Sequence, residues 1–206
     1  KGKKSEMCQK CSRPSCIQPK ICPNMNIDHT PLLELYRKVD SLPCIKKSFI
    51  GSGVRYDMLL HRSGDKRLDD AADRYIEELI TKHVSGRLKV APEHTCDNVL
   101  RLMRKPPFRQ FHDFKRIFDK INSREGLKQQ IIPYFISSHP GSTLENMAEL
   151  AAETKQLNFH LEQVQDFTPT PMTMATEMYY TGINPLDMKR VYAPDDYREK
   201  LMQRAL

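Results

Sequence analysis

The chain has 206 residues, of which 39% are hydrophobic and 29% are charged. This balance is typical of a globular protein and excludes a disordered or collagen-like chain. No apolar run approaches the roughly 18 residues that a membrane-spanning helix needs, so we expect no membrane-embedded segment and no membrane partner. Lys and Arg exceed Asp and Glu by 33 to 26, a net charge of +7, and the first residue is Lys1 rather than Met, which suggests a piece of a longer protein.

Four of the six cysteines lie within fifteen positions near the start of the chain: Cys8, Cys11, Cys16 and Cys22. No signal peptide opens the sequence, so we expect a reducing cytoplasm, where clustered thiols favour a metal site over a disulfide framework. Converging thiolates suit zinc or an iron–sulfur cluster, and free thiols, or disulfides formed on isolation, are the alternative. We expect Cys44 and Cys96 to be ordinary buried or half-buried side chains.

Residues 1–28 are rich in Lys, Cys, Pro and Asn and lack periodicity, which predicts an irregular arm. Residues 29–206 carry regular patterns throughout and end in a helix. The first predicted helix begins at Thr30-Pro31, with Thr30 as the N-cap and proline in the first turn. Its apolar stripe comprises Leu32, Leu35, Tyr36 and Val39.

Four short strands are predicted, at Lys46–Ser52, Arg87–Ala91, Lys128–Ile136 and Glu162–Phe167. Apolar residues recur at helical spacing between them, over 68–83, 99–103, 108–121 and 144–157. Ser142 and Glu145 form a candidate capping box for the last of these helices. Successive strands start 34 to 41 residues apart. That spacing leaves room for helical crossovers, so we expect parallel strands and an α/β fold.

Three of the predicted strands have one apolar face and one polar face, whereas the parity of the first is ambiguous. Leu88 and Val90 share one face, and Lys89, Ala91 and Glu93 share the other. Ile131 and Phe135 oppose Gln130 and Tyr134 in the same way, and Val164 opposes Gln163 and Gln165. A doubly wound sheet would be covered by helices on both faces. The polar second face favours a curved, partly open barrel whose inner surface meets a polar ligand.

Polar segments follow all four predicted strands, where parallel α/β folds bind their ligands. Arg55 offers a fork for a carboxylate or phosphate, Glu93 could accept from sugar hydroxyls or an amine, and His94 could move protons. Plain turn chemistry and solvated side chains are the alternative at each position taken alone. A phosphate-binding loop, a Rossmann glycine fingerprint and a nucleophile elbow are all absent from the sequence. The segments are 51–55, 91–94, 137–142 and 168–171.

Eight motifs are distributed along most of the chain: Cys11–Cys16, Pro19–Pro23, Phe49–Asp57, Leu88–Thr95, Leu102–Pro107, Pro133–Gly141, Val164–Pro171 and Met178–Gly182. In combination they resemble the YgiQ-type family of radical S-adenosylmethionine (SAM) proteins, from about Cys11 to Leu206. The order of the strands also resembles, more distantly, the later strands of radical-SAM methylthiotransferases.

The resemblance implies the C-terminal portion of a partial, TIM-like (βα)6 barrel. It also implies SAM and a 4Fe–4S cluster, which would generate a 5′-deoxyadenosyl radical for hydrogen abstraction from an unknown substrate. By position, Ser52 and Arg55 would lie near the methionine moiety, and Lys89 and Glu93 near the ribose or carboxylate. The residues that would border the adenine are Ile136, Ser138 and Phe167.

One departure from the resembled family concerns the cluster. The C-x3-C-x2-C motif that defines radical-SAM proteins is absent from this chain. The arm cysteines have other spacings, and they precede strands that match the middle of the barrel. The resemblance therefore implies cluster ligands outside this chain, and a fragment that is inactive alone. The arm itself would hold zinc or a second iron–sulfur site. The alternative function is a non-catalytic binding module whose basic surface contacts RNA or a protein partner.

Overall fold

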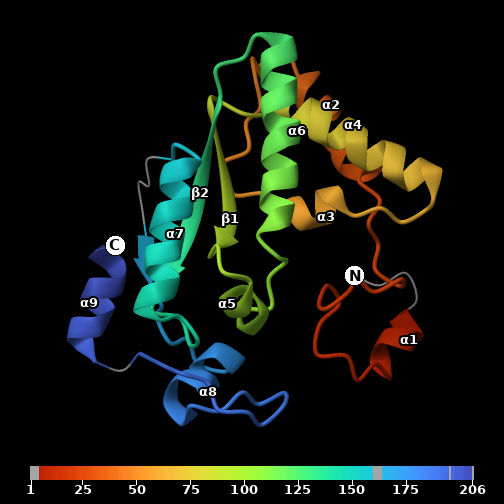
Figure 1. The fold of residues 1–206 in the computed structure, drawn as a ribbon. Helices are drawn as coiled ribbons and strands as arrows, with labels where there is room; N and C mark the ends of the chain where they lie inside the picture. The colour runs from red at the N-terminus through yellow and green to blue at the C-terminus, as the bar shows by residue number, and fades with distance from the viewer. Residues whose placement is uncertain (1–4, 160–163, 195, 206) are drawn as a thin grey trace. The chain divides into compact units, whose positions relative to one another are not determined.

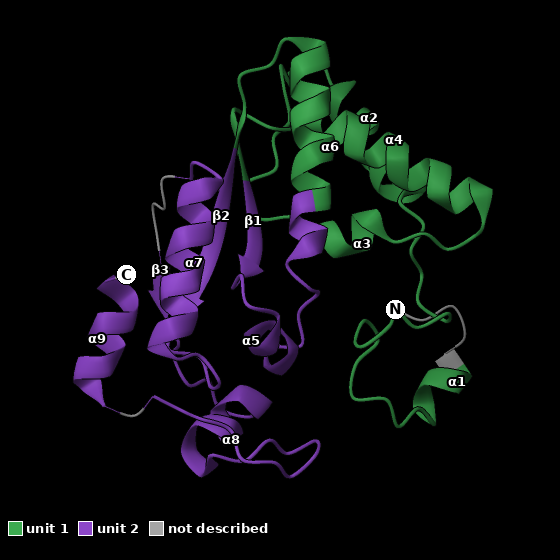
Figure 2. Ribbon diagram, viewed as in Figure 1, with its two compact units in different colours: residues 1–88, 113–130 green, residues 89–112, 131–206 purple. Residues whose placement is uncertain are grey.

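The computed structural model describes residues 5–159, 164–194 and 196–205 (Figure 1). The chain divides into two compact units, residues 1–88 with 113–130 and residues 89–112 with 131–206 (Figure 2). The predicted arm falls within the first unit. The helices and strands are α1 (Ser5–Gln9), α2 (Thr30–Asp40), α3 (Tyr56–Leu60), α4 (Lys66–Lys82), β1 (Arg87–Glu93), α5 (Asp97–Leu102), α6 (Arg109–Glu125), β2 (Gln130–Ser137), α7 (Leu144–Gln156), β3 (Val164–Asp166), α8 (Met174–Thr181) and α9 (Tyr197–Ala205).

The longest helix of the first unit, α4, forms where the periodicity predicts it. Asp65 caps its start by accepting hydrogen bonds from the backbone N–H groups of Arg67 and Leu68. The predicted stripe is buried, because its spacing places these side chains on one side of the helix. Its members are Leu68, Ala72, Tyr75, Ile76, Leu79, Ile80 and His83.

Helix α2 begins one residue earlier than predicted. His29 is the N-cap residue and Thr30 is already helical, because the Asp28 carboxylate accepts from the Thr30 N–H at 2.9 Å. The predicted stripe is also shifted. Leu33 is the buried residue, whereas Leu35 is 54% exposed.

The predicted strand Lys46–Ser52 is wrong, because this segment forms no strand. Ile50 donates one backbone hydrogen bond to the His83 carbonyl, at 2.9 Å. The Ser48 hydroxyl contacts Asp40 and the His83 ring instead of facing a neighbouring strand. A short segment of this kind does not form a strand when no ladder of backbone partners lies alongside.

The second unit is built on a three-stranded sheet in the order β1-β2-β3, whose arrows all point the same way (Figure 1). β2 and β3 pair in parallel, with Ile136 opposite Gln165 and Ser137 opposite Asp166. Three of the four predicted strands are therefore confirmed, and so is the α/β class. The expected start of the last strand and Gln163 lie outside the described residues. The partial barrel stays a prediction.

The predicted alternation is confirmed over most of β1 and over β2, whereas Glu93 at the end of β1 is buried and Val164 of β3 is only half-buried. Leu88, Val90, Ile131 and Phe135 are buried, whereas Lys89 is exposed. The stripe predicted over 108–121, most of which lies on α6, is also buried: Phe108, Phe111, Phe114, Phe118 and Ile121. These side chains place the apolar face of each element in the protein interior.

The capping box of α7 lies one residue later than predicted. Thr143 is the N-cap, and its hydroxyl accepts from the Asn146 N–H while the Asn146 side chain accepts from the Thr143 N–H. Ser142 is fully buried instead, with its hydroxyl 3.5 Å from the His94 ring. Throughout the described ranges, no helix is both long enough and apolar enough to cross a membrane.

Candidate functional site

A cavity of about 370 Å³ lies at the carboxyl ends of the three strands in the second unit. Its walls come from the polar face of the sheet, with Glu93 from β1, Tyr134 and Ile136 from β2, and Gln165 from β3. Because Ile136 and Gln165 are direct partners across the strands, their side chains lie on the same face. Other lining residues include Met103, Lys105, His139, Asp166, Phe167, Thr168, Thr170 and Thr173.

Glu93 has an unusual backbone and a half-satisfied carboxylate. Its φ is 71°, in the left-handed region that side chains with a Cβ rarely adopt. Lys105 donates to Oε1 at 2.7 Å, whereas Oε2 is buried and has no hydrogen-bond partner among the described residues. A buried acceptor without a donor is costly, and strained backbone is typical of ligand-binding sites. The geometry therefore leaves Oε2 available to a donor group in the cavity.

Ser138 repeats this combination directly after β2. Its φ is 60°, and its buried hydroxyl oxygen also lacks a hydrogen-bond partner in the part of the chain that the structure describes. Its backbone N–H donates to the Gln203 side chain at 3.0 Å. Two neighbouring strand ends thus each have a left-handed residue that is not glycine and an unsatisfied buried oxygen.

The Tyr134 hydroxyl lies on the same face and donates a hydrogen bond to the Gln165 side-chain oxygen. Burial, followed by the negative charge of Glu93, raises the pKa of Tyr134 above its ordinary value. The phenol therefore stays protonated and acts as a donor at neutral pH.

His94 is a backbone cap and does not contact solvent. Its Nδ1 accepts from the N–H groups of Thr95 and Cys96, both at 3.0 Å, so the proton resides on Nε2. Burial, followed by the proximity of His139, lowers the pKa of His94 to about 4. The predicted proton-transfer role does not fit a ring that is fixed in this neutral form.

His139 borders the cavity and is also neutral, because burial lowers its pKa to about 4. Its Nδ1–H donates to the Pro140 carbonyl at 2.8 Å. Its ring meets Phe167 edge-on, with the ring centroids 5.1 Å apart. These contacts give the cavity one aromatic wall.

The predicted SAM-site residues do not all meet in this cavity. Glu93, Ile136 and Phe167 line it, and Ser138 lies directly beyond the end of β2. Lys89 is exposed on β1 and is not among the lining residues. Ser52 and Arg55 belong to the first unit, where the Arg55 guanidinium donates to Asp57 at 2.6 Å.

Sequence reasoning missed several residues of the site. Lys105 lies in the motif Leu102–Pro107, but its position in the sequence does not indicate a contact with Glu93. Tyr134 and Gln165 could have been found from strand parity, which places both on the polar face. Gln203 carries no local signal, because its partners are about sixty residues away in the sequence.

The arm cysteines belong to the first unit, whereas the residues that line this cavity belong to the second. Cys8, Cys11 and Cys16 are exposed and Cys22 is half-buried. The Cys22 N–H donates to the Cys16 carbonyl at 2.7 Å. No three His, Cys, Asp or Glu residues in the described ranges are placed to hold a metal ion, so the metal site at the arm stays a prediction.

Comparison with known proteins places close relatives over nearly the whole chain. A UPF0313 protein of Bacteroides thetaiotaomicron is 63% identical over 204 residues, which are 99% of this chain and 33% of the relative. A UPF0313 protein of Porphyromonas gingivalis is 64% identical over 197 residues, 96% of this chain and 31% of the relative. One from Clostridium perfringens is 49% identical over 196 residues, 95% of this chain and 28% of the relative. The chain thus spans about a third of the length of these curated relatives.

Residues 162–206 also match a domain of unknown function, DUF3362. This segment includes β3, α8 and α9, and therefore one strand and one wall of the cavity.

Proposed function

Because the chain belongs with the UPF0313 proteins of the YgiQ family, we propose that it forms part of a radical SAM iron–sulfur enzyme and binds SAM at the strand-end cavity. The resemblance of the motifs motivates the choice of ligand. The observation that carries the proposal is the pair of strained strand ends, Glu93 and Ser138, each with a buried oxygen that awaits a donor.

The cavity residues fit the chemistry of this ligand. SAM offers an ammonium group, ribose hydroxyls and an adenine amine as donors. Glu93 Oε2, in the lining of the cavity, is an acceptor without a donor among the described residues, and so is Ser138 Oγ, directly beyond the end of β2. Ile136 and Phe167 supply apolar surface for a flat base. A volume of about 370 Å³ lies within the range of small-molecule sites.

When bound, SAM and a 4Fe–4S cluster would supply the radical chemistry that abstracts a hydrogen atom from an unidentified substrate. We propose that the ligands of this cluster come from the part of the longer relatives that this chain does not span. The roles of the described residues are to bind and orient SAM. Glu93 would accept from it, the Lys105 ammonium would hold the other carboxylate oxygen in place, and Phe167 would cover the base.

The test uses the full-length protein with its cluster reconstituted under anaerobic conditions. We expect SAM to bind and reductant to release 5′-deoxyadenosine. Glu93→Ala should weaken SAM binding at least about tenfold, because a hydrogen bond to a charged group contributes roughly 1.5–3 kcal/mol. Glu177→Ala, at an exposed position on α8, is the matched control and should bind as the wild type does.

A fully loaded protein that neither binds SAM nor releases 5′-deoxyadenosine would refute the proposal. That outcome would favour the alternative, a binding module whose basic surface contacts RNA or a protein partner.

A further inference from the structure

Helix α9 lies inside the segment that matches DUF3362, and it packs against α7 and β3 of the same unit (Figure 1). Most of its residues are exposed, but Gln203 is completely buried. Glutamine is rarely buried unless its amide is fully paired, since an unpaired amide in the interior is costly. The position of Gln203 therefore calls for a specific explanation.

The amide of Gln203 joins the two ends of the loop that follows β2. Its Oε1 accepts from the Ser138 N–H at 3.0 Å, and its Nε2 donates to the Ser142 carbonyl at 2.9 Å. The two backbone partners determine the orientation of the amide, because an N–H can only donate and a carbonyl can only accept. A third bond, from Nε2 to Glu199 at 3.1 Å, holds the side chain on its own helix.

The loop that Gln203 contacts contains two residues with positive φ angles. Ser138 has a φ of 60° and Gly141 a φ of 90°, both in the left-handed region. Such conformations persist only when surrounding contacts enforce them. The Gly141 N–H donates to the Tyr192 carbonyl at 2.6 Å, so a second contact from the DUF3362 segment holds the same loop.

The same helix also reaches the end of β3. Arg204 donates to the Asp166 carboxylate at 3.0 Å, and the Ser137 hydroxyl donates to the other oxygen of Asp166 at 2.6 Å. Asp166 lines the cavity. Consecutive residues of α9 thus contact the ends of β2 and β3, the two strands that border the site.

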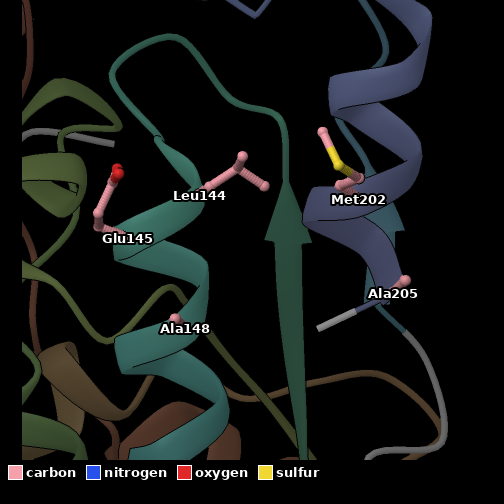
Figure 3. Close-up of a pocket in the computed structure, with 5 residues that line it drawn as sticks. All are labelled: Leu144, Glu145, Ala148, Met202 and Ala205. Carbon is pink, nitrogen blue, oxygen red and sulfur yellow. The ribbon is translucent and has the colours of Figure 1, made fainter.

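Apolar packing does not explain this placement of the helix. Two neighbours of Gln203, Met202 and Ala205, line an open groove of about 520 Å³ between α9 and α7. Figure 3 shows Leu144 of α7 pointing into this groove from the other side. The hydrogen bonds of Gln203 and the ion pair of Arg204 with Asp166 therefore hold α9 against the loop and β3, beside this open groove.

We propose that the DUF3362 segment positions the SAM site of this protein, with Gln203 as the positioning residue. It fixes the left-handed turn at Ser138, and thereby the positions of the residues on either side of it, Ile136 and His139, which line the cavity. This inference rests on the proposed function, because it names the device that shapes the same site. Gln203 itself does not touch the ligand.

The test compares variants of the full-length protein with its cluster loaded. Gln203→Leu keeps the volume of the side chain but removes both hydrogen bonds to the loop. We expect SAM affinity to fall about tenfold or more, as two buried backbone groups lose their partners. Amide hydrogen exchange of the 138–142 peptide should become about tenfold faster even without SAM. Arg198→Ala, on the same helix at an exposed position, is the control and should change neither value.

Gln203→Glu separates positioning from general stability. A charged carboxylate still accepts from the Ser138 N–H but cannot donate to the Ser142 carbonyl, whereas a protonated carboxyl group can do both. Burial raises the pKa of the introduced group. The SAM affinity of this variant, relative to the wild type, should therefore recover as the pH falls from about 8 to about 6.

The outcomes distinguish the two proposals. A wild-type protein that binds SAM while Gln203→Leu matches it in affinity and in loop exchange would overturn the positioning role and leave the proposed function standing. A loaded wild type that binds no SAM would overturn the proposed function, and with it the role of Gln203 in ligand binding. If the ratio of the SAM affinity of Gln203→Glu to that of the wild type were the same at all pH values, this result would also contradict the positioning role.

Discussion

His94 and His139 lie at neighbouring strand ends, and each uses one ring nitrogen to hold backbone. His94 accepts from two N–H groups at the start of α5, and His139 donates to the Pro140 carbonyl. Burial is the main cause that lowers both pKa values from 6.5 to about 4. At the residue scale, these histidines therefore stabilise the loops around the cavity in their neutral form.

This geometry makes the stability of the chain sensitive to acid. Between pH 6.5 and pH 4 the unfolded state binds protons on these histidines and the folded state does not, so the free energy of unfolding falls as the pH falls. We expect a loss of about 2 kcal/mol per histidine between about pH 7 and about pH 5. Urea unfolding at a series of pH values measures this loss.

The double variant His94→Gln with His139→Gln is the comparison. Its side chains cannot take up a proton, so its stability should fall less steeply over the same pH range, although it starts lower at neutral pH. An acid slope equal to that of the wild type would show that other groups cause the sensitivity.

At the scale of elements, the sequence predicted what depends on local periodicity. The stripes of α4 and α6 are long and regular, and a stripe of that kind is buried whichever elements cover it. The strand expected at Lys46–Ser52 is wrong, because a strand also needs a partner strand that hydrogen-bonds along its length, which a local pattern cannot indicate. The caps of α2 and α7 are each displaced by one residue, because Asp28 accepts from the Thr30 N–H and Thr143 accepts from the Asn146 N–H.

The candidate site was predictable only in part, for a related reason. Glu93 and Ile136 follow from strand parity and from the rule that ligands meet the carboxyl ends of parallel strands. Lys105 and Gln203 enter through tertiary contacts over separations of 12 and 65 residues. Such contacts depend on the packing of elements and leave no trace in spacing.

Gly141, in the loop between β2 and α7, occupies a position that we expect no other residue to adopt without strain. Its φ is 90°, and a Cβ at this position would lie 2.2 Å from Cδ1 of Leu102. Gly141→Ala should destabilise the chain by at least about 1–2 kcal/mol, because the left-handed backbone alone costs that much and Leu102 must also move. Thermal unfolding gives the measurement.

Gly51→Ala is the matched control, since a Cβ there meets no atom within 4 Å and its φ carries no restriction. It should leave the unfolding temperature nearly unchanged or raise it slightly, as alanine restricts the unfolded chain. Equal effects of the two substitutions would contradict the strained geometry of the loop at Gly141.

At the scale of the whole molecule, the residues of the cavity and the cysteines of the arm belong to different compact units. The cavity and the DUF3362 segment belong to the second unit, and the four arm cysteines belong to the first. The chain also spans about a third of the length of its relatives. A complete catalytic centre in the proposed enzyme would therefore combine the strand-end cavity with residues from beyond this chain.

The cysteine arm provides the final prediction, which concerns a metal separate from the proposed catalytic cluster. The thiols of Cys8, Cys11, Cys16 and Cys22 are exposed or half-buried. Metal binding and local folding are coupled, because ligands converge only when the ion neutralises and orders them. We expect protein purified without oxygen to contain zinc or iron bound at the arm.

Metal analysis of single-cysteine variants tests this site. Cys11→Ser and Cys16→Ser should each lose most of the arm's metal, because a structural site with three thiolates binds far more weakly than one with four. Cys44 lies outside the arm and is exposed, so the expectation that it is buried or half-buried is wrong. Cys44→Ser should retain the metal of the wild type. A content below about 0.1 metal ion per wild-type chain would contradict a metal site at the arm, because structural zinc binds tightly. Equal loss in Cys44→Ser and Cys11→Ser would place the metal elsewhere than at the arm.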